Sequence, residues 1–262
     1  MCSPTHRHKF SYVLVVGMWW VWIILTALLF VLLGLLSTRS NFESGIPKII
    51  HQTAPADTSK WHPIWHQCQK SWKEKFPDYE YKMWTDEDLD DLIRTKYSWF
   101  YPTFKGYDLK IKRIDAARYF MLYEHGGIYA DMDFECVNNF EDMLKKDKVS
   151  IAESPWKNGP SGETHQNALM ISPKGHPFWE KVFNLLDKHK NNRDVLFTTG
   201  PRIIMEALHN DTSIESLPYQ KFAPQHTEEF TSSYEAGRKT ISPPSDPSIF
   251  TRHHSTSVWN NY

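Results

Sequence analysis

The sequence predicts an α/β domain in which helices cover both faces of a central sheet. Short apolar, β-branched segments alternate with segments of helical periodicity from about residue 46 onward, which is typical of a three-layer architecture. The breaks between these segments contain glycine or proline, and the chain holds no internal repeat or low-complexity tract. About 220 residues follow an apolar N-terminal stretch, enough for one domain with a buried core.

The first half of this domain is predicted to alternate strand and helix twice. Ile46–Thr53 is β-branched, apolar and ended by polar residues, as expected of a strand. Trp61–Lys75 places apolar residues at helical spacing, and Tyr79–Trp84 alternates like a second strand. The remaining elements of this half are a helix over Asp86–Lys96, an aromatic loop over Tyr97–Tyr107 and a helix over Leu109–His125.

The second half is predicted to continue the alternation after a break at Gly126 and Gly127. A short apolar strand runs from Ile128 to Asp133. The later elements are a helix over Phe140–Lys146, strands over Val149–Ala152 and Asn167–Ile171, helices over Phe178–Lys190 and Thr198–His209, and a late strand at Phe222–Pro224. A polar tail containing His253, His254 and Trp259 follows.

Two aspartates at the end of one predicted strand form the first candidate site. Asp131 and Asp133 close the apolar segment that follows the paired glycine. Side chains alternate along an extended strand, so the two carboxylates should point the same way. Paired carboxylates suit Mg²⁺ or Mn²⁺, especially when a diphosphate supplies the other ligands. The pattern therefore favours an enzyme that acts on a nucleotide-activated substrate.

Spacing alone does not single out this pair, because the tripeptides 86–88 and 88–90 also have an aspartate at each end. Those aspartates follow Thr85, a predicted helix N-cap, where acidic residues interact favourably with the helix dipole. We therefore interpret them as a solvated helix start. Asp131 and Asp133 differ because they end a buried strand, where ligands gather in α/β folds.

A second pair of charged residues, Asp115 and Arg118, lies in the predicted helix Leu109–His125. Residues three apart share a helix face, so these two can bond to each other or to a common ligand. The residues alone leave both interpretations open, a local ion pair or a pair that holds a ligand.

The N-terminal segment is predicted to be a membrane anchor. Residues 13–36 are almost wholly apolar, uncharged and about 24 in number, enough to cross a bilayer with some tilt. A cleaved signal peptide is the alternative, although its apolar core is shorter. Basic residues before the span favour a cytosolic tail over residues 1–12. The predicted topology is single-pass type II, with a stem at 37–45 and a lumenal domain at 46–262.

Composition narrows the class of partner. The chain has 30 basic and 31 acidic residues and a formal charge of −1, without basic clusters, so a nucleic acid is not an expected partner. Cys68 and Cys136 could pair in an oxidising lumen or stay free, and the sequence does not decide between the two. Asn210 begins an N-glycosylation acceptor tripeptide, which agrees with a lumenal domain.

Several motifs occur together and in the order found in one family. They are Ile46–Thr53, Asp115–Tyr119, Gly126–Asp133, His176-Pro177, Thr199-Gly200-Pro201, and His253-His254 followed by Trp259. Over about residues 46 to 259 the chain resembles the DXD-containing sugar-transferase family, glycosyltransferase family 32. That family includes initiating α-1,6-mannosyltransferases and inositol phosphoceramide mannosyltransferases. The resemblance implies a GT-A fold, in which a nucleotide-binding half and an acceptor-binding half form one domain.

The resemblance also implies roles for the charged candidate residues. Asp133 would be the principal ligand of Mn²⁺ or Mg²⁺, and Asp131 would bridge the metal and the ribose of the donor. Asp115 and Arg118 would hold hydroxyls of the donor sugar. The metal would neutralise the leaving diphosphate, and the anomeric configuration would be retained.

The resemblance implies further contacts to the donor and the metal. His51 and Thr53 would lie near the nucleotide, and Asn167 near the reacting face of the sugar. A C-terminal histidine would complete the metal site, and Trp259 would close over the nucleotide. We prefer His253 as that histidine because Trp259 follows it by six residues, and His254 is the alternative.

These features together predict a membrane-anchored, metal-dependent retaining glycosyltransferase that transfers a hexose in the lumen of the Golgi or the endoplasmic reticulum. The expected donor is GDP-mannose, with a UDP-sugar as the alternative, and the expected acceptor is a glycan or a glycolipid such as the sphingolipid inositol phosphoceramide. Two other classes stay open. One is a metal-dependent phosphotransferase, although the chain lacks a glycine-rich phosphate loop. The other is a non-catalytic, membrane-anchored protein that binds a sugar nucleotide or a glycan.

Overall fold

The computed structural model describes residues 22, 24–26, 44–155, 162–224 and 247–256. Residues 1–40 and 41–262 form two separate compact units. The predicted anchor at 13–36 lies almost wholly outside the described residues, and Trp259 lies outside them as well. Within the described part, we found no helix that is both long enough and apolar enough to cross a membrane.

A six-stranded sheet and a small two-stranded sheet form the framework of unit 41–262. The strands are β1 (Ile49–Thr53), β2 (Glu80–Trp84), β3 (Gly127–Ala130), β4 (Phe134–Cys136), β5 (Val149–Glu153), β6 (His165–Ser172), β7 (Ile214–Leu217) and β8 (Thr251–His253). The large sheet has the order β2-β1-β3-β6-β5-β7, and β4 pairs with β8. β1 is parallel to β2 and β3, and β5 is parallel to β7, whereas β6 is antiparallel to both of its neighbours. The predicted mixed α/β fold is therefore confirmed.

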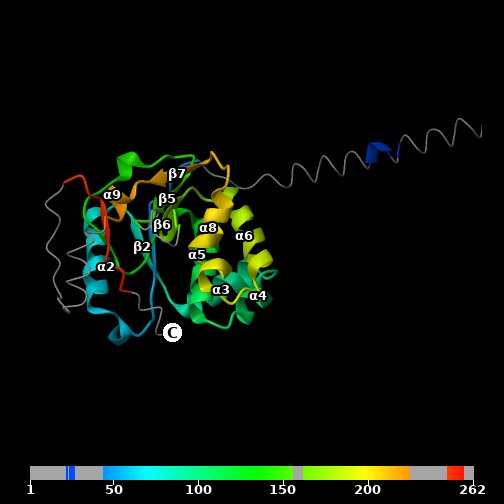
Figure 1. Cartoon of the computed structure of the whole chain (residues 1–262), viewed down its shortest axis with the longest axis horizontal. Coiled ribbons are helices and arrows are strands. Elements are labelled where there is room, and N and C mark those ends of the chain that lie inside the picture. Colours follow the sequence, from blue (N-terminus) through cyan, green and yellow to red (C-terminus); the bar gives the residue numbers. More distant parts are fainter. Residues whose placement is uncertain (1–21, 23, 27–43, 156–161, 225–246, 257–262) are drawn as a thin grey trace, which may run out of the picture. The chain divides into compact units, whose positions relative to one another are not determined.

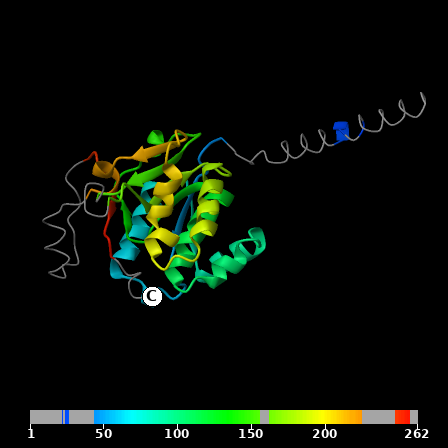
Figure 2. The ribbon, with the colours of Figure 1, turned by 45° about the vertical axis from the view of Figure 1, so that its right-hand side comes forward.

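Helices cover both faces of the large sheet (Figure 1). They are α2 (Pro63–Lys75), α3 (Asp86–Lys96), α4 (Tyr101–Gly106), α5 (Lys110–His125), α6 (Phe178–His189), α7 (Val195–Thr198), α8 (Pro201–Leu208) and α9 (Tyr219–Phe222), with 3-10 turns η1 (Thr58–Lys60) and η2 (Glu141–Met143). α3, α5, α6 and α8 pack on one face, where Tyr129 and Met170 of the sheet join Phe120 in a single core. Figure 2 shows α6 and α8 side by side on this face.

The opposite face is covered by α2 and α9. Trp72 of α2 and Phe222 of α9 pack there with Ile50 and Leu169 of the sheet. The sheet strands thus bury apolar side chains on both sides, as strands between two helical layers must. The parallel strands β1, β2 and β3 terminate at the same end of the sheet, and polar side chains lie at that end.

The paired glycine connects α5 to β3 as the sequence predicts. Gly126 caps the C-terminus of α5 with φ of 65° and donates its N–H to the Leu122 carbonyl. Gly127 has φ of 90°, and a Cβ at this position would lie 2.5 Å from the Ile49 carbonyl oxygen. Only glycine therefore lets β3 start this close to β1. This contact fixes the strand that leads into the aspartates.

Several predicted elements differ from the structure. The predicted loop Tyr97–Tyr107 contains α4, because Pro102 stands in the first turn of that helix, where it is tolerated. The predicted strand Phe222–Pro224 is wrong, since α9 ends at Phe222. The predicted helix Phe140–Lys146 is only the turn η2. β7 and β8 were missed because strands of three or four residues are too short to show a period.

The structure of this unit bears on two predictions about single residues, the pairing of the cysteines and the glycosylation of Asn210. Cys68 and Cys136 are both buried free thiols, so of the two alternatives the structure shows the unpaired one. Asn210 lies exposed in the turn that follows α8, with φ of 59°. Its glycosylation stays a prediction.

Candidate active site

The two aspartates lie in a turn rather than at the end of a strand. β3 stops at Ala130, and the backbone N–H of Phe134 donates to the Asp131 carbonyl oxygen over 2.9 Å. The argument from strand alternation is therefore wrong, because it required an extended backbone as far as Asp133. Both carboxylates nevertheless line the same two pockets. The turn achieves this by burying Met132 between them, against Trp65.

Asp131 is held by hydrogen bonds on its carboxylate and on its backbone. Its Oδ1 accepts a 2.6 Å hydrogen bond from the Tyr129 hydroxyl and lies 3.1 Å from Nη1 of Arg118. Its backbone N–H donates to the Ala168 carbonyl oxygen over 2.8 Å. Burial raises the pKa of Asp131 above its usual value, and the positive charge of Arg118 opposes that rise.

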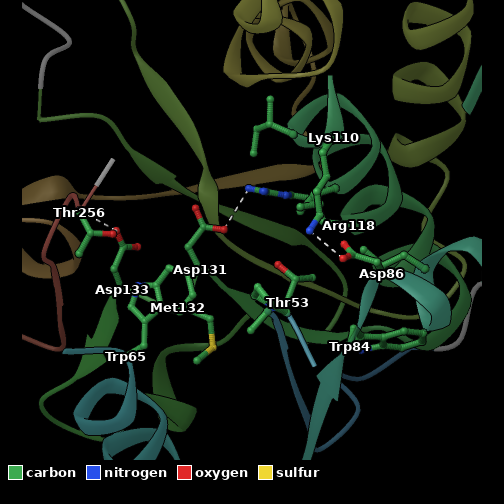
Figure 3. A pocket seen from close by; sticks show the side chains of 15 residues that line it. Thr53, Trp65, Trp84, Asp86, Lys110, Arg118, Asp131, Met132, Asp133 and Thr256 are labelled. Carbon is green, nitrogen blue, oxygen red and sulfur yellow. Dashed lines mark hydrogen bonds and ion pairs between the residues drawn. The ribbon is translucent and has the colours of Figure 1, made fainter. Parts of the chain in front are cut away.

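The pKa of Asp133 is shifted in the opposite direction from that of Asp131. Figure 3 shows Asp133 beside Thr256. Its Oδ2 accepts hydrogen bonds from the backbone N–H and the hydroxyl of Thr256, over 2.8 and 2.9 Å. Its Oδ1 lies 3.3 Å from Nε2 of His253. Burial acts to raise the pKa of Asp133, but His253 and Thr256 together outweigh burial and hold the pKa well below its usual value. Asp133 is therefore an anion at neutral pH.

Arg118 joins the two sites that the sequence predicts separately. Its guanidinium lies 2.9 Å from Oδ1 of Asp115 and 3.1 Å from Oδ1 of Asp131. It also donates to the Asn167 carbonyl oxygen over 2.9 Å and lies over the Tyr129 ring. The residue is 3% exposed, so this is a buried ion network and not a surface pair. The structure thus shows the ion pair, which also lines a pocket, and its role in holding a ligand stays a prediction.

Asp115 is the most shielded carboxylate of this network. Burial raises its pKa to about 6, and the neighbouring Arg118 acts against that rise. The side-chain amide of Asn167 donates to its Oδ1 over 3.1 Å and also to the Tyr119 hydroxyl over 3.0 Å. Thr199, from the Thr-Gly-Pro motif, lies 3.5 Å from the other oxygen. Asn167 is thus placed beside the charged pair by β6, as its predicted role requires.

The two C-terminal histidines lie on different sides of β8. β8 pairs with β4 so that His253 stands opposite Phe134, and the two rings stack at 4.4 Å. The His253 imidazole faces Asp133, whereas Nε2 of His254 lies 3.0 Å from Glu135. Burial acts to lower the pKa of His253, but Asp133 reverses this and raises it. Of the two candidate ligands, the structure places His253 at the aspartates.

The two predicted donor contacts on β1 occupy different environments. Thr53 lines a pocket with Asp131, and its hydroxyl lies 3.2 Å from that of Tyr129. His51 is fully buried behind this pocket. Its Nε2 lies 2.9 Å from the Gly126 carbonyl oxygen, and its Nδ1 accepts from the Trp84 indole over 3.0 Å. Burial lowers its pKa to about 3, so His51 is a neutral residue of the core whose ring atoms are engaged within the protein.

Two adjoining pockets share Arg118, Asp131 and Asp133 as a common wall. The apolar pocket is lined by Thr53, Trp84, Leu89, Ile111 and Ile114, together with the charged residues Asp86 and Lys110. The polar pocket is lined by Asp115, Glu163, Gln166, Asn167 and His253. The polar pocket has a volume of about 310 Å³, which is at the lower end of the range for small-molecule sites.

Sequence reasoning missed several residues of these pockets. Asp86 was set aside as part of a helix start, yet it lines the apolar pocket with its carboxylate 2.7 Å from Nζ of Lys110. Thr256 and Glu163 stand in segments with no periodicity, so no local pattern could have indicated them. Tyr129, inside the Gly-Gly-Ile-Tyr run, is fully buried in β3, and its hydroxyl donates to Asp131.

The carboxylates fit a cation that arrives with its own phosphate ligands. In the described part of the chain, no three His, Cys, Asp or Glu side chains are grouped to hold a metal unaided. Asp131 and Asp133 together supply carboxylate oxygens on one wall of both pockets. Mg²⁺ is commonly bound by one or two carboxylates plus substrate phosphates, and Mn²⁺ also prefers oxygen ligands. The donor set therefore fits a metal–diphosphate complex better than a free ion.

The sequence matches known proteins over this region. Residues 63–150 match a family described as "Glycosyltransferase sugar-binding region containing DXD motif". Inositol phosphoceramide mannosyltransferase 3 of Schizosaccharomyces pombe is 37% identical over 167 residues, which cover 62% of this chain and 44% of that protein. The initiation-specific alpha-1,6-mannosyltransferase of Candida albicans is 32% identical over 200 residues, covering 62% and 52%. The chain thus spans about half the length of these two relatives.

The solved PaToxG glycosyltransferase aligns with 77% of this chain and 76% of its own, at 19% identity and a TM-score of 0.49.

Proposed function

We propose that the chain, which matches a glycosyltransferase family with a DXD-containing sugar-binding region over residues 63–150, is a metal-dependent hexosyltransferase that uses GDP-mannose. The observation that carries this proposal is the position of Asp131 and Asp133. They stand where the apolar pocket meets the polar pocket. A nucleoside diphosphate sugar has the same three parts in the same order, an aromatic base, a diphosphate and a polar sugar.

The apolar pocket is the proposed site of the nucleoside. Leu89, Ile111 and Ile114 offer apolar surface to a flat base, and Thr53 offers a hydroxyl beside Asp131. The polar pocket is the proposed site of the hexose, because its amides and carboxylates can pair with sugar hydroxyls. We propose a GT-A fold for unit 41–262, with both pockets in its nucleotide-binding half.

Asp131 and Asp133 are the residues that would hold Mn²⁺ or Mg²⁺, with His253 as a third neighbour. When bound, the metal supplies positive charge that stabilises the leaving diphosphate. Asp133 is prepared for this role, since Thr256 fixes its Oδ2 and the carboxylate stays ionised. His253 can coordinate only as the neutral imidazole, so protonation of His253 would compete with metal binding there.

Arg118, Asp115 and Asn167 are proposed to orient the donor sugar. They are interconnected, with Arg118 bonded to Asp115 and to the backbone of Asn167. Held in this way, their remaining hydrogen-bonding atoms face the polar pocket as a rigid set. The buried Nε of Arg118 has no hydrogen-bond partner in the described structure. We propose that the reaction retains the anomeric configuration, as the family resemblance implies.

The acceptor and the location are the least constrained parts of the proposal. The names of the relatives given above refer to mannosyltransferases that act on inositol phosphoceramide or initiate an alpha-1,6 chain. We propose by analogy a glycan or glycolipid acceptor such as inositol phosphoceramide. The apolar stretch at residues 13–36 supports a type II anchor that leaves the site in the lumen of the Golgi or the endoplasmic reticulum.

The full-length chain in detergent, supplied with Mn²⁺ and a panel of nucleotide sugars, tests this function. We expect slow release of GDP from GDP-mannose, which requires the metal and stops on chelation. The isosteric variant Asp133→Asn should reduce the rate at least a hundredfold, whereas Asp88→Asn, on the exposed start of α3, should leave it unchanged.

Other outcomes of the same experiment would assign the chain to a different functional class. Binding of GDP-mannose without any transfer or hydrolysis, in wild type and with candidate acceptors present, would show a non-catalytic binding protein. Release of phosphate from nucleoside triphosphates would show a phosphotransferase. A folded protein that neither binds nor cleaves any nucleotide sugar would overturn the proposal.

A further inference from the structure

We propose that Asp86 and Lys110 select guanine as the base of the donor nucleotide. The inference rests on the proposed function, because it assumes that the apolar pocket holds the nucleoside. It goes beyond that function by assigning base specificity to two residues that belong to none of the motifs named above.

The two residues form a charged edge on an otherwise apolar pocket. Asp86, in the first turn of α3, and Lys110, in the first turn of α5, are 2.7 Å apart between Oδ2 and Nζ. Both line the apolar pocket with Leu89 and Ile114. Figure 3 shows them across the pocket from Asp133, with Thr53 in between. A nucleotide whose diphosphate lies at the aspartates would therefore direct its base toward this pair.

The pair presents the pattern of charges that complements guanine. The Watson–Crick edge of guanine carries an acceptor, O6, followed by two neighbouring donors, N1–H and the N2 amino group. The carboxylate of Asp86 can accept from both donors in parallel, and the ammonium of Lys110, immediately beside it, can donate to O6. One acid and one base in contact thus match all three groups of that edge.

The other common bases do not match this pattern. Uracil has a single N–H between two carbonyl oxygens, so one carbonyl would face the carboxylate of Asp86. Adenine and cytosine each place a ring nitrogen acceptor beside their amino group, which a carboxylate also repels. A site that binds a ligand by charged hydrogen bonds discriminates strongly against analogues that leave those groups unpaired.

A purely structural role accounts poorly for the position of Asp86. The capping box of α3 is made by Thr85 and Asp88, so the helix start does not need Asp86 for its N-cap. Asp86 is half exposed, and an exposed ion pair such as the one with Lys110 stabilises a protein by about 0–1 kcal/mol. The neighbouring Glu87 lies on the same turn without lining the pocket, which makes it a matched control.

The test is calorimetric binding of GDP, IDP and UDP to the full-length chain in the presence of Mn²⁺. IDP is GDP without the N2 amino group, so it removes one of the two donors that Asp86 would accept. Wild type should bind GDP about tenfold more tightly than IDP, which corresponds to about 1.4 kcal/mol, and UDP should bind more weakly still. Asp86→Asn should abolish the preference for GDP over IDP, and it should strengthen the binding of UDP because it removes the carboxylate that faces a uracil carbonyl.

Two further variants make the result specific. Glu87→Gln should keep the wild-type order of affinities. Lys110→Met should weaken GDP and IDP equally, because both nucleotides carry O6. Equal wild-type affinities for the three nucleotides, or a GDP preference that survives Asp86→Asn, would overturn this inference and leave the proposed function intact. Absence of metal-dependent binding of any nucleoside diphosphate would instead overturn both.

Discussion

Two tripeptides with an aspartate at each end, 86–88 and 131–133, contribute to the same pocket, the first through Asp86 and the second through both aspartates. In the segment 131–133 both carboxylates are enclosed, one against Arg118 and the other against Thr256. In the segment 86–88 both are exposed, and their roles diverge. Asp88 caps α3, while Asp86 turns toward Lys110.

The difference shows that the spacing of two aspartates does not determine their chemistry. Their burial and their partners do. A buried carboxylate must be paired, and its pKa then depends on the balance between desolvation and its partners. This is why Asp131 and Asp133 have pKa shifts of opposite sign although one residue separates them. Solvated carboxylates at a helix start are instead free to serve the cap or a neighbouring cation.

The largest effect on stability is expected at Arg118, whose positive charge neutralises buried carboxylates. Arg118→Met would leave Asp115 and Asp131 without their buried positive partner. The free energy of unfolding in denaturant should fall by about 3–5 kcal/mol. The exposed Arg94–Asp91 pair on α3 supplies the control, and Arg94→Met should cost less than about 0.5 kcal/mol. Similar small losses for both variants would mean that the buried carboxylates do not depend on Arg118.

The next effect is a pH dependence that belongs to the buried network. The pKa of Asp115 is raised from 3.8 to about 6, so the folded state binds more protons than the unfolded state between these values. Its contribution to stability is therefore complete below about pH 4 and is lost as the pH rises through 6. Asn at this position does not titrate.

Asp115→Asn should consequently gain stability relative to wild type as the pH rises from 4 to 6, by up to about 1.4 kcal/mol per pH unit. Paired denaturation curves across that range measure the difference. A difference that stays constant, or that changes in the opposite direction, would show that Asp115 is not held in its protonated form by burial.

The smallest effect belongs to the exposed segment. Asp88→Ala removes the acceptor for the Thr85 backbone N–H and should lower the free energy of unfolding by about 0.5–1 kcal/mol. Its affinity for GDP with Mn²⁺ should match that of wild type, because Asp88 does not line the pocket. Loss of nucleotide binding in this variant would contradict the assignment of base recognition to Asp86 and of helix capping to Asp88.

Much of the fold could be predicted from the sequence because a regular spacing of apolar residues over a long segment indicates whether it is a helix or a strand. α2, α3, α5 and α6 agree with the predicted helices to within two residues, and β1, β2 and β6 lie at predicted strands. The elements that differ depend on tertiary contacts. β8 exists because β4 pairs with it, and α9 follows Pro218 and ends at Phe222, where the predicted strand Phe222–Pro224 begins.

The candidate site was predictable only in part. Motifs indicated Asp115, Arg118, Asp131, Asp133 and His253, and Asn167 was expected near the sugar. The structure brings these six together around the polar pocket. His51 shared the same motifs but lies in the core, because a residue of a strand can face either side. Asp86, Lys110 and Thr256 come from segments distant in the sequence, and only folding brings them to Asp131. The role of each residue stays a proposal.

The most direct test of the comparison is to make one isosteric change in each tripeptide. Calorimetry would measure the affinity of GDP for Asp133→Asn and Asp88→Asn, each with and without Mn²⁺. We expect Asp88→Asn to keep the wild-type, metal-dependent affinity, and Asp133→Asn to lose the contribution of the metal. If both variants bind GDP with Mn²⁺ as wild type does, the segment 131–133 is not the metal site.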